Sequence, residues 1–164
     1  MGSQNWLGQE HLMVSPTSDD IDILEQAKRV LAPDYVPGED EEYMNERHQA
    51  YFRMLLIEWK RSIHNAAGQT LQSLQDGPIR EPDLNDRASS ETDWGIELRT
   101  RDRQRKLISK IDAALRRLDE GEYGYCEVTG DPIGLKRLIA RPVATMTVEA
   151  QEAHERREKV SRDD

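Results

Sequence analysis

Residues 52–74 read FRMLLIEWKRSIHNAAGQTLQSL, and this stretch decides the fold. Its apolar and small residues recur at steps of three and four: Phe52, Leu55, Leu56, Trp59, Ile63, Ala66, Ala67, Thr70, Leu71 and Leu74. This period places them on one face of an α-helix, and the small residues favour close approach of a partner helix. The sequence therefore predicts a long helix from Tyr43 onward that forms one arm of a coiled coil.

A second long helix is predicted after a break in the pattern. Gly77-Pro78 ends the first helix, and the second begins near Asp83 or Asp86 and continues to Glu120, where Gly121 provides the stop. Its apolar face comprises Trp94, Leu98, Ile108, Ile111, Leu115 and Leu118. Because the two helices have similar lengths and a short join, we expect a long antiparallel coiled-coil hairpin over 43–120 with its tip at 76–88.

The segments on either side of the hairpin complete a mainly α protein. Residues 1–18 have few apolar residues and no period, which predicts disorder. Residues 19–42 are predicted to form a short helix and a linker, and one side of that helix carries Ile21, Leu24 and Leu31. Residues 121–164 are predicted to form a small globular module, on which the hairpin docks, and a C-terminal helix from Val148 to Val160.

Composition and charge exclude several classes of protein. The formal net charge is −9, which argues against free nucleic acid as the main partner. Within this average, residues 18–46 carry ten acids and two bases, whereas residues 99–117 carry eight bases and two acids. This basic stretch is either a solvated helix face or a surface for an acidic partner. With no apolar run long enough for a membrane span, no signal-like N-terminus and one cysteine, we expect a cytoplasmic protein.

Residues 123–150 read YGYCEVTGDPIGLKRLIARPVATMTVEA and are spaced like a small zinc ribbon with a short apolar hairpin. The four ligand positions implied by this spacing hold Cys126, Thr129, Thr147 and Ala150. A threonine hydroxyl is a poor zinc ligand and alanine is none, so we predict a zinc-ribbon-like module without zinc. Burial of four side chains is expected to replace the metal: Val128, Ile133, Val143 and Met146.

Four stretches of the chain resemble the DksA/TraR family of bacterial transcription regulators. They are PGEDEEYMNE (37–46), DLNDRAS (83–89), ELRTRDRQRKLISKI (97–111) and GYCEVTGDPIGLKRLIARP (124–142). The resemblance covers the chain from residue 37 onward and places it in a cysteine-poor branch. It implies a regulator that binds RNA polymerase through the secondary channel, not DNA, and destabilises open promoter complexes. It further implies action with the alarmone ppGpp in the stringent response, with no bound cofactor of its own.

The resemblance also implies roles for individual residues. Asp83, Asp86 and Ala88 match the tip that lies near the polymerase active site. Arg99, Arg103 and Lys110 match a face that docks against the acidic rim of the channel. The ppGpp pocket between regulator and polymerase matches Leu107, Lys110 and Arg141. Its next basic position holds Gln151, and the lost cation should weaken attraction for phosphate.

Two other functions remain open on the sequence. One is a structural coiled-coil adaptor for another protein, in which Asp83 and Asp86 only cap the second helix and Lys110 and Arg141 are surface charges. The other is a channel-binding factor that promotes transcript cleavage with metal held by its acidic tip. An enzyme is not expected, because no nucleophile–base pair, phosphate-binding loop or closed metal set is present and the four histidines are scattered. We also expect a monomer that does not bind membranes.

Overall fold

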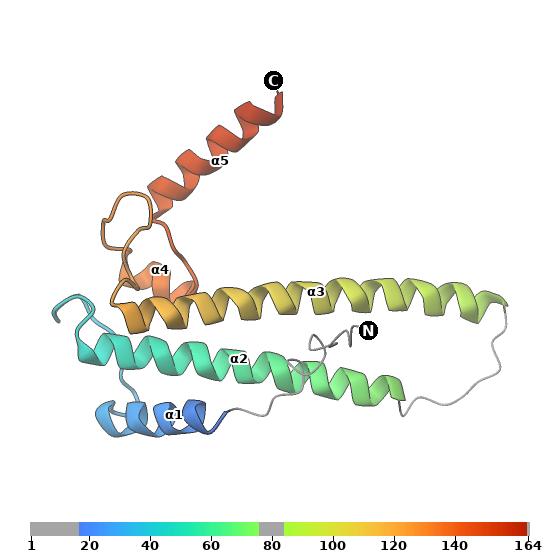
Figure 1. The fold of residues 1–164 in the computed structure, drawn as a ribbon, viewed down its shortest axis with the longest axis horizontal. Helices are drawn as coiled ribbons and strands as arrows, with labels where there is room; N and C mark the ends of the chain where they lie inside the picture. The colour runs from blue at the N-terminus through green and yellow to red at the C-terminus, as the bar shows by residue number, and fades with distance from the viewer. Residues whose placement is uncertain (1–16, 76–83, 164) are drawn as a thin grey trace, which may run out of the picture.

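The structure is a computed structural model of the 164-residue chain, and it describes residues 17–75 and 84–163. The elements are α1 (Ser18–Val30), α2 (Glu46–Gln75), α3 (Leu84–Glu120), α4 (Leu135–Ala140) and α5 (Val148–Asp163) (Figure 1). The described residues contain no strand, only an isolated antiparallel β-bridge between Tyr125 and Pro132. The prediction of a mainly helical protein is therefore confirmed. The predicted disorder of the N-terminus concerns residues that, apart from 17 and 18, lie outside the described part.

The two long helices, α2 and α3, lie side by side and antiparallel (Figure 1). Two ion pairs connect them, Lys60 with Asp112 at 2.8 Å and Arg53 with Asp119 at 2.5 Å. In both pairs the residue numbers add to 172, so in this register Gln75 is level with Glu97. The first thirteen residues of α3, 84–96, therefore extend past the end of α2 by about 20 Å at 1.5 Å per residue.

The buried residues of the pair are concentrated at one end, which we call the base. Phe52 and Leu56 of α2 and Ile111 of α3 are completely buried there. Beyond Ile63, toward the free end, none of the side chains described on either helix is buried. Six residues of the base belong to one continuous core with the C-terminal module: Phe52, Leu56, Ile63, Ile111, Ala114 and Leu118.

The prediction that Trp94 and Leu98 pack against the first helix is wrong. Their side chains are 54% and 57% exposed. Trp94 lies beyond the last turn of α2, so no residue of that helix is level with it. Leu98 is level with the last turn of α2, whose side chains lie outside the described part. The predicted seam residues Thr70, Leu71 and Leu74 have side chains outside the described part.

The first helix, α1, packs against α2. Its N-terminus is capped by Thr17, whose Oγ1 accepts a hydrogen bond from the Asp20 N–H at 3.3 Å. Leu24 and Leu31 are buried, whereas Ile21, predicted on the same side of the helix, is 43% exposed. None of the helices that the structure describes has the length and apolar character needed to cross a bilayer.

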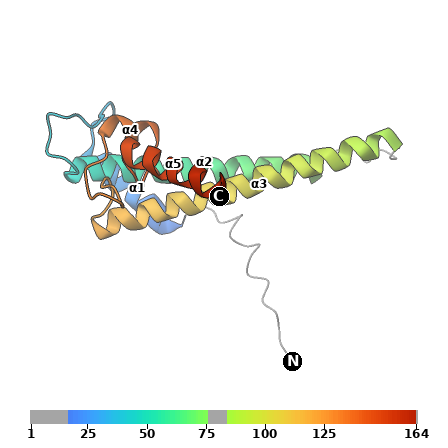
Figure 2. The ribbon, with the colours of Figure 1, turned by 90° about the horizontal axis from the view of Figure 1, so that it is seen from above.

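Hydrogen bonds hold the C-terminal module at the base of the pair. The Tyr43 hydroxyl donates to the carbonyls of Gly124, at 2.6 Å, and Ile133. The Tyr123 hydroxyl donates to the Pro142 carbonyl at 2.7 Å in a buried position. Beyond this module α5 projects away from the long pair (Figure 1), so in the view from above it is drawn over the pair (Figure 2).

Candidate functional site

The four residues at the ligand positions implied by the zinc-ribbon spacing come together in the C-terminal module. The Cys126 side chain is buried, with 3% of its surface exposed, and receives hydrogen bonds from the Thr129 side chain and the N–H groups of Val128, Thr129 and Thr147. Thr147 Oγ1 accepts a hydrogen bond from the Ala150 N–H at 3.3 Å. Burial raises the pKa of the Cys126 thiol, but the hydrogen bonds outweigh it and lower the pKa to about 7.

This donor set does not fit zinc. A structural zinc site takes four ligands from cysteine, histidine or carboxylate, and three of the four positions here offer none of these. Within residues 17–75 and 84–163 no three side chains of His, Cys, Asp or Glu cluster in a way that could hold a metal ion.

Backbone hydrogen bonds close the turn around Cys126. The Cys126 N–H donates to the Asp131 carbonyl and the Gly130 N–H donates to the Cys126 carbonyl, both at 2.8 Å. The Glu127 N–H donates to the Thr145 carbonyl at 2.9 Å and so connects the two halves of the ribbon. The prediction that Val128 is buried is wrong, because its side chain is 56% exposed, whereas Ile133 is completely buried.

Arg117 joins α3 to this module, a role that the sequence did not indicate. Its guanidinium donates to the Glu122 carbonyl at 3.1 Å and the Tyr125 carbonyl at 2.7 Å, and lies 3.6 Å from the Glu127 carboxylate. The chain reverses direction at Gly121, and the N–H groups of Glu122 and Tyr123 both donate to the Arg117 carbonyl. These bonds bring the start of the module close to Arg117. The one feature of the sequence that could have indicated this role is the position of Arg117 in the last turn of a helix, shortly before a glycine.

A second group that the sequence did not indicate surrounds His48, which is completely buried. His48 Nδ1 accepts a hydrogen bond from the Met44 N–H at 3.2 Å, and its Nε2 lies 3.2 Å from Glu41. The Tyr35 hydroxyl donates to the same carboxylate at 2.5 Å. This bond, with those from the Gly38 N–H and His48, holds the pKa of Glu41 below its usual value although burial raises it. The group fixes the chain where α2 begins.

The predicted docking residues Arg99, Arg103 and Lys110 are all exposed on α3. Within the parts of the chain that the structure describes, none of the three has an ion pair. Lys106, on the same side of α3, pairs with Asp102 at 3.0 Å. The structure therefore presents a basic surface along α3.

The predicted alarmone residues come from three different places. Leu107 is half-buried and Lys110 exposed on α3, whereas Arg141 is exposed directly after α4. Gln151 is half-buried on α5, and its side-chain amide donates to Glu155 Oε1 at 2.9 Å. No hydrogen bond joins these four described residues, so a shared ligand site stays a prediction.

Of the predicted tip, 76–88, the structure describes only the α3 backbone from Leu84 onward, at the free end. Asp83 is outside the described residues. Asp86 and Ala88 belong to the first turns of α3, but their side chains are also outside the described part. The tip assignment therefore stays a prediction.

Comparison with known proteins identifies the family. The model of the DnaK suppressor protein DksA N-terminal domain matches residues 48–118. The RNA polymerase-binding transcription factor DksA of Caulobacter vibrioides is 63% identical over 131 residues, which cover 80% of this chain and 92% of that protein. The chain belongs to the DksA family.

Other DksA proteins agree with this assignment. The Escherichia coli RNA polymerase-binding transcription factor DksA is 42% identical over 123 residues, or 75% of this chain and 80% of that protein. The solved structure of transcription factor DksA2 from Pseudomonas aeruginosa has a TM-score of 0.66 at 39% identity, covering 73% of this chain and 94% of that one. A model described as the prokaryotic dksA/traR C4-type zinc finger matches residues 121–156, although this DksA chain has a single cysteine.

Proposed function

We propose that this chain is a transcription regulator that binds RNA polymerase, enters its secondary channel with the free end of the α2–α3 pair, and destabilises open promoter complexes. The observation that carries the proposal is the free end itself, where α3 extends past α2 and exposes Trp94 and Ile96. A protruding helical end whose described apolar side chains are exposed is suited to a narrow cavity in a larger partner. The names of the relatives, transcription factors and not enzymes, point to the same partner.

The long pair acts as an antiparallel coiled coil. Its two ion pairs are separated by seven residues on each helix, which is the coiled-coil repeat. In this arrangement Asp83, Asp86 and Ala88 form the tip beside the polymerase active site. The two carboxylates act on the polymerase, and no catalytic group is needed in the regulator.

The basic surface of α3 orients the regulator in the channel. Arg99, Arg103 and Lys110 pair with an acidic rim, which favours association and the correct orientation. Leu107, Lys110 and Arg141 contribute to a ppGpp site shared with the polymerase in the stringent response. Gln151 supplies no charge there, so ppGpp binds more weakly than it would with a cation at that position.

The module folds without zinc, and the protein works as a cytoplasmic monomer that does not bind DNA directly. The hydrogen bonds to the Cys126 thiol support the zinc-free state. Elemental analysis of protein purified without chelators should give well under one zinc per chain, and EDTA should leave the helical circular dichroism unchanged. One zinc per chain, or loss of helicity with EDTA, contradicts this part of the proposal.

In vitro transcription from a ribosomal promoter, with and without ppGpp, tests the regulatory function. Wild type should lower transcription, and more so with ppGpp, whereas Asp86→Asn should bind polymerase but lose the effect. Asp93→Asn, an exposed acid further along α3, is the matched control and should behave as wild type. Full regulation by Asp86→Asn contradicts the assigned tip.

The same preparations separate the two other candidate functions. Polymerase core should be the main protein captured from a lysate, and capture of a different protein alone would favour an adaptor. A backtracked elongation complex should show no transcript cleavage on addition of the protein. Cleavage that depends on Asp83 and Asp86 would favour a cleavage factor.

A further inference from the structure

The two long helices contain glycines that the folded chain does not require. A Cβ added at Gly68 of α2 or at Gly95 of α3 would meet no atom within 4 Å. By contrast, a Cβ at Gly124 would lie 2.9 Å from the Met44 side chain and 3.0 Å from the Tyr43 hydroxyl. Glycine is a poor residue for a helix interior, so packing within this chain explains Gly124 but not Gly68 or Gly95.

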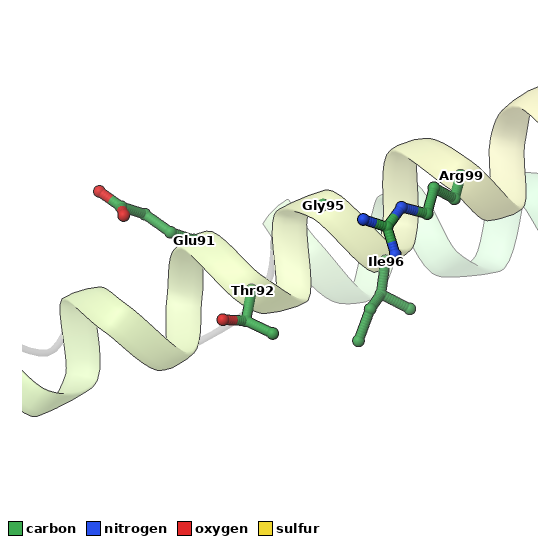
Figure 3. Close-up of a pocket in the computed structure, with 5 residues that line it drawn as sticks. All are labelled: Glu91, Thr92, Gly95, Ile96 and Arg99. Carbon is green, nitrogen blue, oxygen red and sulfur yellow. The ribbon is translucent and has the colours of Figure 1, made fainter.

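Gly95 differs from Gly68 in its surroundings. It lies in a shallow hollow on α3 lined by Glu91, Thr92, Gly95, Ile96 and Arg99 (Figure 3). Residues 91, 95 and 99 form one row of the i±4 type along the helix, and the missing side chain leaves a notch in that row. Helices pack by fitting the ridges of one into the grooves of the other, and a small residue at the crossing shortens the distance between their axes.

The hollow is continuous with the basic surface. At 100° per residue, Gly95, Arg99, Arg103, Lys106 and Lys110 fall within about 80° of one another around α3. All four cations are exposed. A partner that follows this face from the base toward the free end therefore meets the four cations first and the notch at Gly95 last.

We propose that the Gly95 hollow receives an acidic helix of RNA polymerase, packed against the α3 backbone, and so fixes how deeply the regulator enters. The inference rests on the proposed function and adds to it a contact residue and the chemistry of its partner. A helix fits because the notch interrupts a ridge, and acidic character fits because the approach is lined with cations. Nucleic acid fits less well, since Ile96 is 55% exposed beside the notch and offers an apolar contact that a helix surface can match and a phosphate backbone cannot.

Glycine substitutions test the contact directly. Polymerase core is titrated with fluorescently labelled wild type, Gly95→Ala, Gly95→Leu and the matched pair Gly68→Ala and Gly68→Leu. We expect Gly95→Ala to weaken binding about tenfold and Gly95→Leu by about a hundredfold, because added carbons hold the two helices apart. Both Gly68 variants should bind as wild type does, and circular dichroism should show that all variants are folded.

The outcomes separate this inference from the proposed function. If wild type does not bind the polymerase, the proposed function fails. If wild type binds and Gly95→Leu binds equally well, only the Gly95 contact is wrong. Equal weakening by Gly68→Leu and Gly95→Leu would also overturn it, since the glycines would then matter through helix flexibility. In a last titration, duplex DNA replaces the polymerase. Tight DNA binding that Gly95→Leu abolishes would overturn the choice of a protein partner.

Discussion

The base and the free end of the α2–α3 pair are built from the same two helices but are stabilised differently. At the base, Phe52 and Ile111 are completely buried, and the C-terminal module packs over them. At the free end Trp94 is 54% exposed, and the described contacts there include the i,i+4 ion pair of Arg101 with Glu97 at 3.2 Å. The difference shows that the apolar side chains described at the base are used for packing within the chain, whereas Trp94 and Ile96 at the free end are not.

The largest contrast is expected from truncation of aromatic side chains at the two ends. Phe52→Ala should lower the free energy of unfolding by about 3–5 kcal/mol, because it leaves a cavity in the core. Trp94→Ala should change it by less than about 0.5 kcal/mol, the usual range for surface positions. Urea denaturation followed by circular dichroism measures both. Similar losses for the two variants would mean that the free end is packed as tightly as the base.

A smaller effect is expected from one hydroxyl at the base. Tyr123→Phe leaves the Pro142 carbonyl without its buried donor and should lower the free energy of unfolding by about 1–3 kcal/mol. Tyr51→Phe is the control, since the Tyr51 hydroxyl has no hydrogen bond to a described residue. A Tyr123→Phe variant as stable as wild type would show that the module does not depend on this bond.

The Cys126 thiol should make the stability of the base depend on pH. Its folded pKa of about 7 is below the ordinary thiol value of about 8.5, so the thiolate stabilises the folded state at high pH. This contribution should be complete above about pH 8.5 and should be lost as the pH falls through about 7. The stability difference between wild type and Cys126→Ala, measured in urea from pH 6 to 9, should therefore increase with pH. A constant difference contradicts the role given to the hydrogen bonds around the sulfur.

The smallest expected effect is a gain in stability at the free end. Gly68→Ala and Gly95→Ala should each raise the free energy of unfolding by about 0.5–1 kcal/mol, since nothing obstructs the added methyl group. Gly124→Ala at the base should have the opposite sign, because its φ of +89° and its close neighbours exclude a side chain. Thermal denaturation of the three variants checks the signs. Destabilisation by Gly95→Ala would show that the free end is packed against a surface that we have not recognised.

Local signals in the sequence predicted the helices well. Gly121 ends α3 as expected, with the N–H groups of Gly121 and Glu122 bonded to the carbonyls of Leu118 and Arg117. The short α4 was not expected, because six residues are too few for a periodic pattern to stand out. The apolar period also could not show that Trp94 lies beyond the end of α2, since the period reports which face is apolar but not where the neighbouring helix ends.

Long-range contacts explain what the sequence could not provide in the site. In the sequence, nothing distinguishes Arg117 from the other bases of α3 or His48 from the other histidines. Their roles depend on hydrogen-bond partners that only the folded chain brings close to them. The grouping of Cys126, Thr129, Thr147 and Ala150 could be predicted because ribbon spacing is local to each turn. Apart from the Thr129 hydroxyl, the donors around the sulfur are backbone N–H groups. Every residue except proline carries such a group, so the residue types do not reveal these donors.

The register of the two interhelical ion pairs restricts how the lengths of the two long helices can change. Because Arg53 and Lys60, like Asp112 and Asp119, are seven residues apart, one seven-residue unit can be removed from each arm without breaking the match between the arms. Such a paired deletion shortens the distance from base to tip by about 10 Å. A change of length in one arm alone shifts the whole pairing. Insertions and deletions in related chains should therefore occur in both arms together and in units of one heptad.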